Sequence, residues 1–244
     1  SNSWIIGLLA AIITGVAMSF ILSYCSVVLR TDTTLAGIAM NSMATGLSIL
    51  LLYIFLGVKG DSSQAPSVMI PKISIPVLSE IPILGKLLFN QNLMVYIGIL
   101  CLIFISILLR KTKLGLRIKA AGYNPDAMEA AGIPVNPYKI YSLIICGIFT
   151  GLGGAFLSMV YLSYFSVGMV AGKGFIGLAA EAMGGGIPIF TVLFAFLFGA
   201  VDYFSVGAQS VLGIPYQLLN TLPYLLAMLS LVLYSARTIK NTKK

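Results

Sequence analysis

The sequence contains no histidine and very little charge. Of its 244 residues only 9% are Asp, Glu, Lys or Arg, and none is His. Soluble domains carry about 25% charged residues, so this composition predicts a protein that lies largely within a membrane. Without histidine the chain lacks the commonest general base, the commonest metal ligand and the simplest pH switch. We therefore expect no catalytic residue and no metal site in this chain.

Cysteines and acidic residues are also scarce. Cys25, Cys101 and Cys146 lie singly in or at the ends of apolar runs, with no CxxC pair and no metal-site spacing. They are expected to be small packing residues. The apolar runs contain no pair of acids at a spacing suited to acid–base chemistry, which disfavours a membrane-embedded enzyme.

The sequence is rich in apolar runs, since 59% of its residues are hydrophobic. About 20 such residues cross a bilayer as a helix. We expect full crossings at approximately 4–24, 35–57, 92–109, 139–162, 189–205 and 217–234. The predicted fold is all-α, a polytopic transmembrane helical bundle.

The Gly-rich segment 163–188 decides the number of passes. It contains a short apolar helix from Phe175 to about Met183, too short for an ordinary crossing. If the loop 110–138 and the basic C-terminal tail are both cytoplasmic, parity requires this segment to cross as a broken helix. The prediction is then about seven passes, with an external loop at 58–91.

The distribution of basic residues supports this topology. The chain has 15 Lys and Arg against 7 acids, a formal net charge of +8. Only Lys59, Lys72, Lys86 and Lys173 would be external, and the remaining eleven cytoplasmic. The basic residues gather at the ends of apolar runs and form no single patch, so we expect no nucleic-acid partner.

The cytoplasmic loop 110–138 contains a short predicted helix whose two ends are marked by capping signals. Asn124 is a suitable N-cap, and Pro125 fits the first helical position. Gly132 can close the helix, and Pro134 cannot continue it. We predict a helix from about Pro125 to Ala131, whose apolar face is suited to a soluble partner.

Polar and small residues mark some faces of the crossings. Asn41 and Thr45 share one face, either as hydrogen-bonding contacts between helices or as the lining of a solute path. Asp202 either packs at a helix end or lines the path, because an acid in hydrocarbon is costly unless it is paired or hydrated. The face 147–151–154–158 (Gly, Gly, Gly, Ser) predicts close helix packing.

The run GLRIKAAGYNPDAMEAAGIPVNPYK, residues 115–139, resembles the signature of permeases in binding-protein-dependent ABC importers. It is similar to the branch that serves branched-chain amino acids, simple sugars and nucleosides. The stretches GIAMNSMATGLSILLL, GKGFIGLAAEAMGG and FLFGAVD are closest to the nucleoside and simple-sugar type. The resemblance covers nearly the whole chain, so we expect one permease domain over residues 1–244. Family members usually begin with one more membrane helix, which suggests that an N-terminal helix is lacking here.

The resemblance implies a transport complex in a bacterial plasma membrane. Its expected members are a second permease subunit, two ATP-binding subunits and an extracellular solute-binding lipoprotein. The ATPase would hold ATP and Mg, so this chain needs no cofactor of its own, in agreement with the absence of a GxxxxGK[ST] motif. The residues expected to couple to the ATPase are Gly122, Asn124, Pro125, Met128, Ala130, Ala131, Gly132 and Ile133.

For a nucleoside solute we expect hydrogen bonds from Asn41, Thr45, Asp202 and Asn220, with Phe175 or Tyr224 available for stacking. Three alternatives stay open: a secondary transporter or channel, an ABC permease for branched-chain amino acids, and a non-transporting assembly subunit. Secondary transporters usually show an internal repeat, which this sequence does not clearly have.

Overall fold

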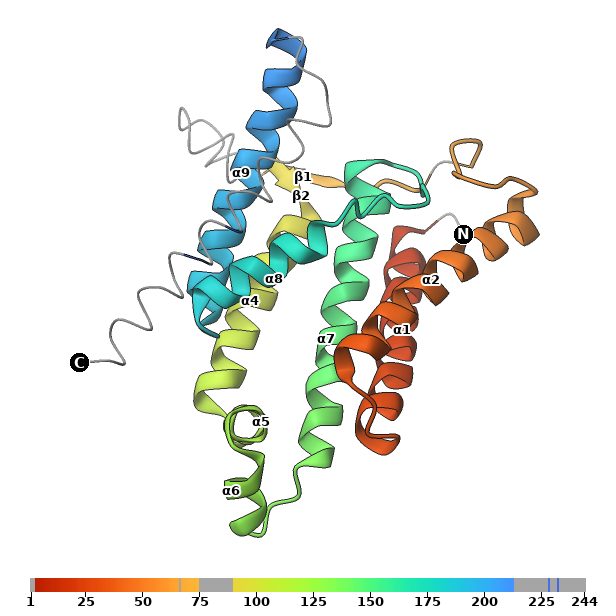
Figure 1. Ribbon diagram of the computed structural model, residues 1–244. Helices are drawn as coiled ribbons and strands as arrows, with labels where there is room; N and C mark the ends of the chain where they lie inside the picture. The colour runs from red at the N-terminus through yellow and green to blue at the C-terminus, as the bar shows by residue number, and fades with distance from the viewer. Residues whose placement is uncertain (1–2, 66, 75–89, 213–227, 229–231, 233–244) are drawn as a thin grey trace. The chain divides into compact units, whose positions relative to one another are not determined.

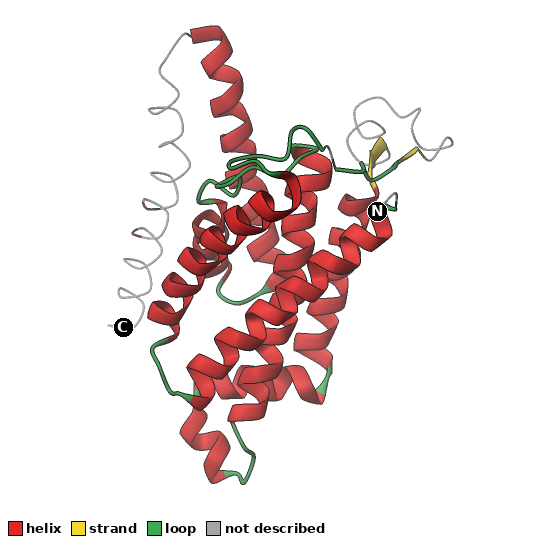
Figure 2. Ribbon diagram, turned by 90° about the vertical axis from the view of Figure 1, so that its right-hand side faces the viewer, coloured by secondary structure: helices red, strands yellow, loops and turns green. Residues whose placement is uncertain are grey.

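The computed structural model describes residues 3–65, 67–74, 90–212, 228 and 232 (Figure 1). The chain forms two compact units, Ser1–Met169 (unit 1) and Val170–Lys244 (unit 2). The described residues are mostly helical (Figure 2), which confirms the all-α prediction.

Four helices of the described chain are long and apolar enough to cross a membrane. They are α1 (Trp4–Ser23), α2 (Thr33–Leu56), α4 (Leu93–Lys111) and α7 (Asn136–Phe156). Short π-helical turns extend two of them, η1 (Tyr24–Val28) after α1 and η2 (Leu157–Tyr161) after α7. These elements match the first four predicted crossings. The predicted crossing at 217–234 lies outside the described residues except for residues 228 and 232, and the seven-pass count stays a prediction.

In unit 1, α1 and α7 pack antiparallel at very short range. A Cβ atom placed on Gly15 would collide with the carbonyl oxygen of Gly147, and one on Gly151 with that of Ala11. A Cβ on Gly147 would lie only 2.6 Å from the Ser19 Oγ. Small residues at i and i+4 allow two helix backbones to approach this closely. The packing prediction is confirmed for Gly147 and Gly151.

The same prediction was wrong for Gly154. A Cβ there would meet nothing within 4 Å in the described chain. The interface instead follows the i+4 row to Ala155 and Met159, both buried in a cluster with Ile70 and Met94. A face spaced at i+4 and i+3 runs nearly parallel to its own helix axis, whereas the row of i+4 steps is inclined to that axis and follows the crossing α1 helix.

Helix α2 is delimited by local signals. The Asp32 side chain accepts hydrogen bonds from the backbone N–H of Thr34 and Leu35, as an N-cap does. The hydrogen bonds from Leu35 and Thr34 lower the pKa of the Asp32 carboxyl. Gly57, with φ +70°, ends the helix in the left-handed conformation that glycine adopts without strain.

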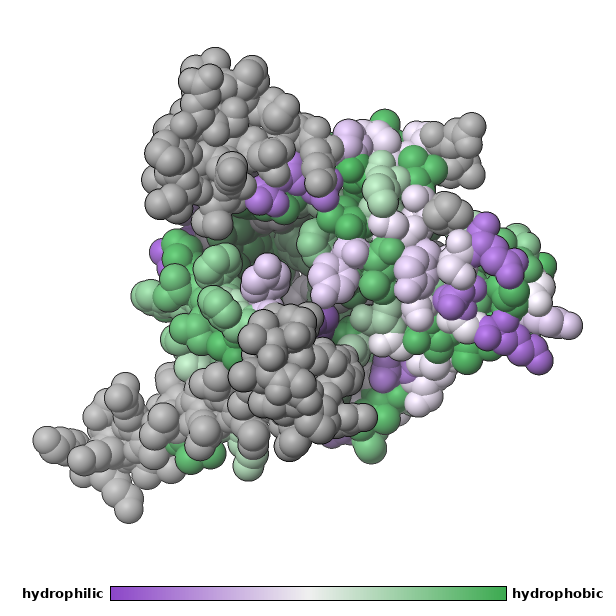
Figure 3. Space-filling view, turned by 90° about the horizontal axis from the view of Figure 1, so that it is seen from above, coloured by the Kyte–Doolittle hydropathy of each residue, from purple (hydrophilic) through white to green (hydrophobic). Residues whose placement is uncertain are grey.

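The predicted external loop 58–91 is partly described. Its strand β1 (Lys72–Ser74) pairs antiparallel with β2 (Asn90–Asn92), with Ile73 opposite Gln91. The first part of the loop joins the segment that follows η2. Backbone N–H of Ser62 donates to the carbonyl of Phe165 at 2.8 Å, and Ser62 Oγ accepts from Phe165 N at 2.9 Å. Figure 3 views this end of unit 1, where strongly hydrophilic residues lie beside apolar ones.

Unit 2 contains a hairpin of two unequal helices. Helix α8 (Lys173–Gly184) has 12 residues and α9 (Pro188–Leu212) has 25. They pack through Ala179, Ala180 and Phe198, which are buried. A Cβ on Gly184 would collide with Thr191, so glycine is required at this tight turn.

Candidate functional site

The loop 110–138 forms two short helices, α5 (Lys113–Tyr123) and α6 (Pro125–Ala130). Helix α6 projects beyond the ends of α4 and α7, and α5 lies between α6 and the end of α4 (Figure 1). The Thr112 hydroxyl joins α4 to α5, because it donates to the Leu108 carbonyl at 2.7 Å and accepts from Gly115 N at 3.1 Å. The turn is tight enough that a Cβ on Gly115 would collide with Leu108.

The ends of α6 follow the sequence prediction. Asn124 Oδ1 accepts a hydrogen bond from Ala127 N at 3.0 Å and caps the helix. Pro125 is the first helical residue, and Asp126 lies in the first turn, where an acid complements the helix dipole. The helix ends at Ala130, one residue before the predicted end. Gly132 follows with φ +74°.

A small hydrophobic cluster holds α5, α6 and the start of α7 together. Its buried members are Ala121, Met128 and Val135, and Ile133 and Tyr138 pack against it. Arg117 Nη1 adds a 2.6 Å hydrogen bond to the hydroxyl of Tyr138. Met128 is only 4% exposed. Met128, expected from the sequence among the coupling residues, thus stabilises the loop from within and does not lie on its surface.

The exposed surface of the loop consists largely of small residues. Ala127, Ala130 and Ala131 are exposed, and so are Gly122 and Gly132. A Cβ on either glycine would meet nothing within 4 Å in the described chain. We call these five residues the small-residue face. Tyr123 lies next to it, with 81% of its surface exposed. Such a face can enter a partner's groove without displacing bulky side chains.

Two of the predicted solute-path residues lie together on α2 in unit 1. Thr45 Oγ1 donates to the backbone carbonyl of Asn41 at 2.9 Å, and both side chains are exposed. The Thr45 hydroxyl proton is therefore used within the helix, and its oxygen can still accept a hydrogen bond. This leaves the Asn41 amide as the stronger hydrogen-bonding group of the face.

The remaining path candidates belong to unit 2. Phe175 lies on α8 with 72% of its surface exposed. Asp202 lies on α9, and its Oδ2 atom is 2.6 Å from Nζ of Lys173, the first residue of α8. Asn220 and Tyr224 lie outside the described residues.

Lys173 is the residue that sequence reasoning missed. The sequence predicts it only as one of four basic residues on the external side, without a role in the solute path. One signal was present. Lys173 begins a short apolar helix, and a single acid, Asp202, interrupts the apolar sequence of the next helix. Because the two residues are 29 positions apart, the sequence did not predict their pairing.

Comparison with known proteins identifies the family. The model of the branched-chain amino acid transport system permease component matches residues 1–235. The chain belongs to this family. It is therefore a multi-pass membrane component of a transport system, as its four apolar helices also indicate.

Individual relatives resemble this permease over most of its length. It is 33% identical to the nucleoside ABC transporter permease protein NupC of Lactococcus lactis subsp. cremoris, covering 97% of this chain and 74% of the relative. It is also 33% identical to the guanosine ABC transporter permease protein NupQ of Bacillus subtilis, covering 95% and 73%.

A more distant relative is the putative glucose ABC transporter permease protein TsgC13 of Haloferax volcanii, 26% identical over 86% of this chain and 62% of the relative. No solved structure matches the chain significantly.

Proposed function

We propose that this chain is the permease subunit of an ABC importer that carries nucleosides across a bacterial plasma membrane. The observation that carries the proposal is the similarity to two relatives named for nucleoside and guanosine transport, at 33% identity over nearly the whole chain. The relative that is named a putative glucose transporter permease supports simple sugars as the second solute class. These relatives disfavour a secondary transporter, a channel or a permease for branched-chain amino acids.

The proposed complex divides the work among its subunits. A separate ATPase binds ATP and Mg and hydrolyses the nucleotide, and an extracellular lipoprotein delivers the solute. We propose two ATP-binding subunits and a second permease subunit. This chain uses no cofactor of its own. Its task is to switch between a state in which the solute site faces outward and one in which it faces inward.

We propose that the loop 110–138 couples this switch to the ATPase. The small-residue face is open, and nothing in the described chain occupies the space beside Gly122 and Gly132. Asn124 and Pro125 keep the short helix formed, and Met128 and Ile133 hold it against α5 and α7. Ala130, Ala131 and Gly132 provide the contact surface. A preformed helix loses little conformational entropy on docking.

The solute path is proposed to include Asn41, Thr45, Asp202 and Asn220 as hydrogen-bonding residues. Phe175 and Tyr224 supply aromatic surface for stacking a nucleobase. An ABC permease needs no ion-coupling acid, so these residues serve recognition and passage only.

Transport by the whole complex tests this function. The permease is reconstituted in proteoliposomes with its ATPase and lipoprotein, and uptake of radiolabelled guanosine is measured with and without ATP. We expect ATP-dependent guanosine uptake that unlabelled nucleosides inhibit. Uptake that does not depend on ATP, or that is selective for leucine, would refute the proposal. Selective uptake of glucose would assign the chain to the simple-sugar class.

A further inference from the structure

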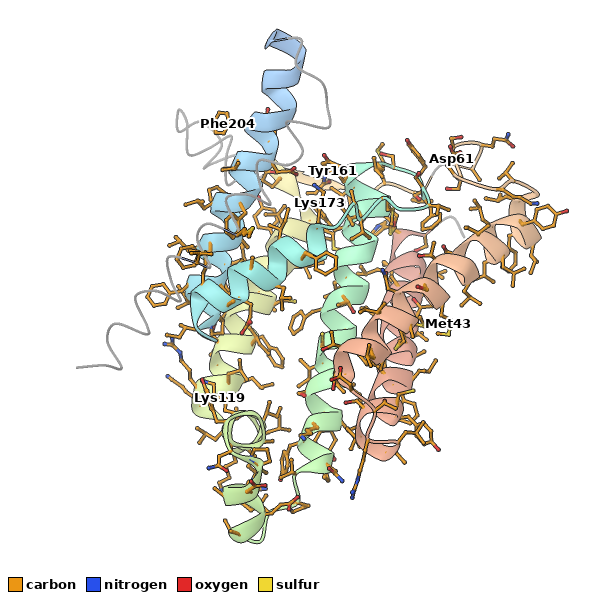
Figure 4. The ribbon with its side chains drawn as sticks, in the orientation of Figure 1. Met43, Asp61, Lys119, Tyr161, Lys173 and Phe204 are labelled. Carbon is orange, nitrogen blue, oxygen red and sulfur yellow. The ribbon has the colours of Figure 1, made fainter. Side chains whose placement is uncertain are left out.

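Unit 2 contains an ion pair between two otherwise apolar helices. Lys173 Nζ and Asp202 Oδ2 are 2.6 Å apart. Asp202 is the single charged residue in the 25 residues of α9. The Lys173 and Asp202 side chains keep 37% and 26% of their surface exposed. The two charges are thus paired but still accessible to a small polar molecule. Figure 4 labels Lys173 where α8 begins.

If the whole of α9 crosses the membrane, the lengths of the two helices place this pair at membrane depth. At 1.5 Å per residue α9 is about 37 Å long, and Asp202 lies about 21 Å from its start at Pro188. If α9 crosses a hydrocarbon core of about 30 Å, the Asp202 carboxylate lies inside that core. Helix α8 measures only about 18 Å, and α9 extends beyond the residue at which α8 begins (Figure 1).

In that arrangement the chain enters α8 within the membrane. Ala171 and Gly172, with φ +47° and +75°, form the non-helical backbone immediately before Lys173. Such backbone is tolerated at membrane depth only where it borders protein or a water-filled cavity. A discontinuous helix at this depth is where transporters commonly place a solute site.

Helix stability does not explain the choice of Lys173. A cation in the first turn of a helix opposes the helix dipole, and an acid would be preferred there. An ion pair in a medium of low dielectric constant is also weak evidence for stability, because desolvation offsets the attraction. Charged residues inside a membrane instead commonly mark a solute or ion pathway.

We propose that Lys173 and Asp202 together recognise the vicinal hydroxyl groups of the solute's ribose, with Lys173 as a specificity-determining residue. This inference rests on the proposed nucleoside function. Adjacent hydroxyls can donate two hydrogen bonds to one carboxylate, and the ammonium group donates to their oxygen lone pairs. Without solute the two side chains satisfy each other, and on binding they exchange this contact for the sugar.

Opposite charges also suit an uncharged solute. The paired charges cancel, so a neutral nucleoside meets both a donor and an acceptor without leaving a net charge unpaired.

The test compares guanosine with 2′,3′-dideoxyguanosine in the reconstituted complex. Uptake rates are measured at saturating solute, so that delivery by the lipoprotein does not limit the ratio. We expect the wild type to prefer guanosine and Asp202→Asn or Lys173→Met to reduce that preference about tenfold, because the lost contacts are charge-assisted hydrogen bonds to the hydroxyls. Glu181→Gln, which neutralises an exposed acid on the same helix, should leave the preference unchanged.

Two double variants separate recognition from a structural role. Lys173→Met with Asp202→Leu removes both charges, and Lys173→Asp with Asp202→Lys exchanges them. If the pair only holds the hairpin together, both double variants keep the wild-type preference for guanosine, and the inference is overturned. If it recognises ribose, both lose the preference even when the permease is present at wild-type amounts.

The wild type distinguishes the two proposals. If it transports no nucleoside at all, the proposed function fails and this inference fails with it. If it transports guanosine and Asp202→Asn retains the full preference, only the ribose assignment is wrong.

Discussion

The α1–α7 interface and the loop 110–138 both rely on small residues, but they use them in opposite ways. At Gly15, Gly147 and Gly151 the space that a side chain would fill is already occupied by the neighbouring helix backbone. At Gly122 and Gly132 that space is empty within the described chain. Sequence composition alone makes the two sets of glycines look alike.

The difference distinguishes glycines that serve the fold from glycines that serve a partner. An occupied glycine contributes to the packing of this chain, and any side chain there forces the helices apart. A glycine with empty space beside it, in a loop whose helix is already capped, adds little to the stability of the chain. The most direct explanation is that another protein fills the space, in agreement with the proposed coupling role.

The largest effect is expected where a side chain is added to a glycine whose space is already filled by the neighbouring helix. Gly151→Leu would drive a side chain into the backbone of α1 at Ala11 and Ile12. Because backbone cannot move aside as a side chain can, we expect a loss of about 3 kcal/mol or more in the free energy of unfolding. The measurement is the amount of protein in the membrane and its melting temperature in detergent.

Gly153→Leu is the matched control, on the same helix but with nothing within 4 Å of the added Cβ in the described chain. It should leave both quantities near the wild-type values. Equal melting temperatures for the two variants would contradict the close α1–α7 packing.

The second effect concerns the small-residue face of the loop 110–138. Ala131→Arg adds a long charged side chain to the small-residue face, so the loop should no longer enter a groove. We expect solute-stimulated ATP hydrolysis by the complex to fall to its basal rate, while the permease keeps its melting temperature. Ala120→Arg, an equally exposed position on α5, is the control and should retain stimulation. Full stimulation in Ala131→Arg would rule out this docking surface.

A smaller effect is expected inside the loop. Met128→Ala removes the central side chain of the cluster with Ala121 and Val135. We expect the loop to lose about 2 kcal/mol of local stability, seen as faster amide hydrogen exchange over residues 124–138. Met43→Ala, which truncates a methionine that is 43% exposed on α2, should not change exchange in the loop. Unchanged exchange in Met128→Ala would mean that the cluster does not hold α6.

The smallest effect concerns the helix cap. Asn124→Ala removes the side-chain acceptor for Ala127 N and should cost about 1 kcal/mol locally. Exchange of the Ala127 amide should be about fivefold faster, whereas Asn124→Ser, which keeps a capping oxygen, should behave like the wild type. Identical exchange in the Ala and Ser variants would show that Pro125 alone sets the helix start.

The sequence predicted most of the secondary structure in the described residues. Apolar runs of the right length marked α1, α2, α4 and α7, since a bilayer imposes a minimum length on any crossing helix. The ends of α6 were predicted to within one residue, because its cap, Asn124, acts on residues three positions away or closer. The family resemblance was also visible in these local patterns, and the family comparison confirmed it.

The tertiary structure decided what local patterns could not. It determined that Gly147 and Gly151, but not Gly154, contact α1, because the direction of a helix crossing selects which of two adjacent rows is buried. It turned Met128 inward, because Ala121 and Val135 on neighbouring segments offered it a hydrophobic contact. It also joined Lys173 to Asp202 across 29 residues, a pairing that depends on how α8 and α9 fold back on each other. Sequence thus determined the helices, their caps and the family, and only tertiary packing separated the residues that hold the permease together from those left open to its partners and solute.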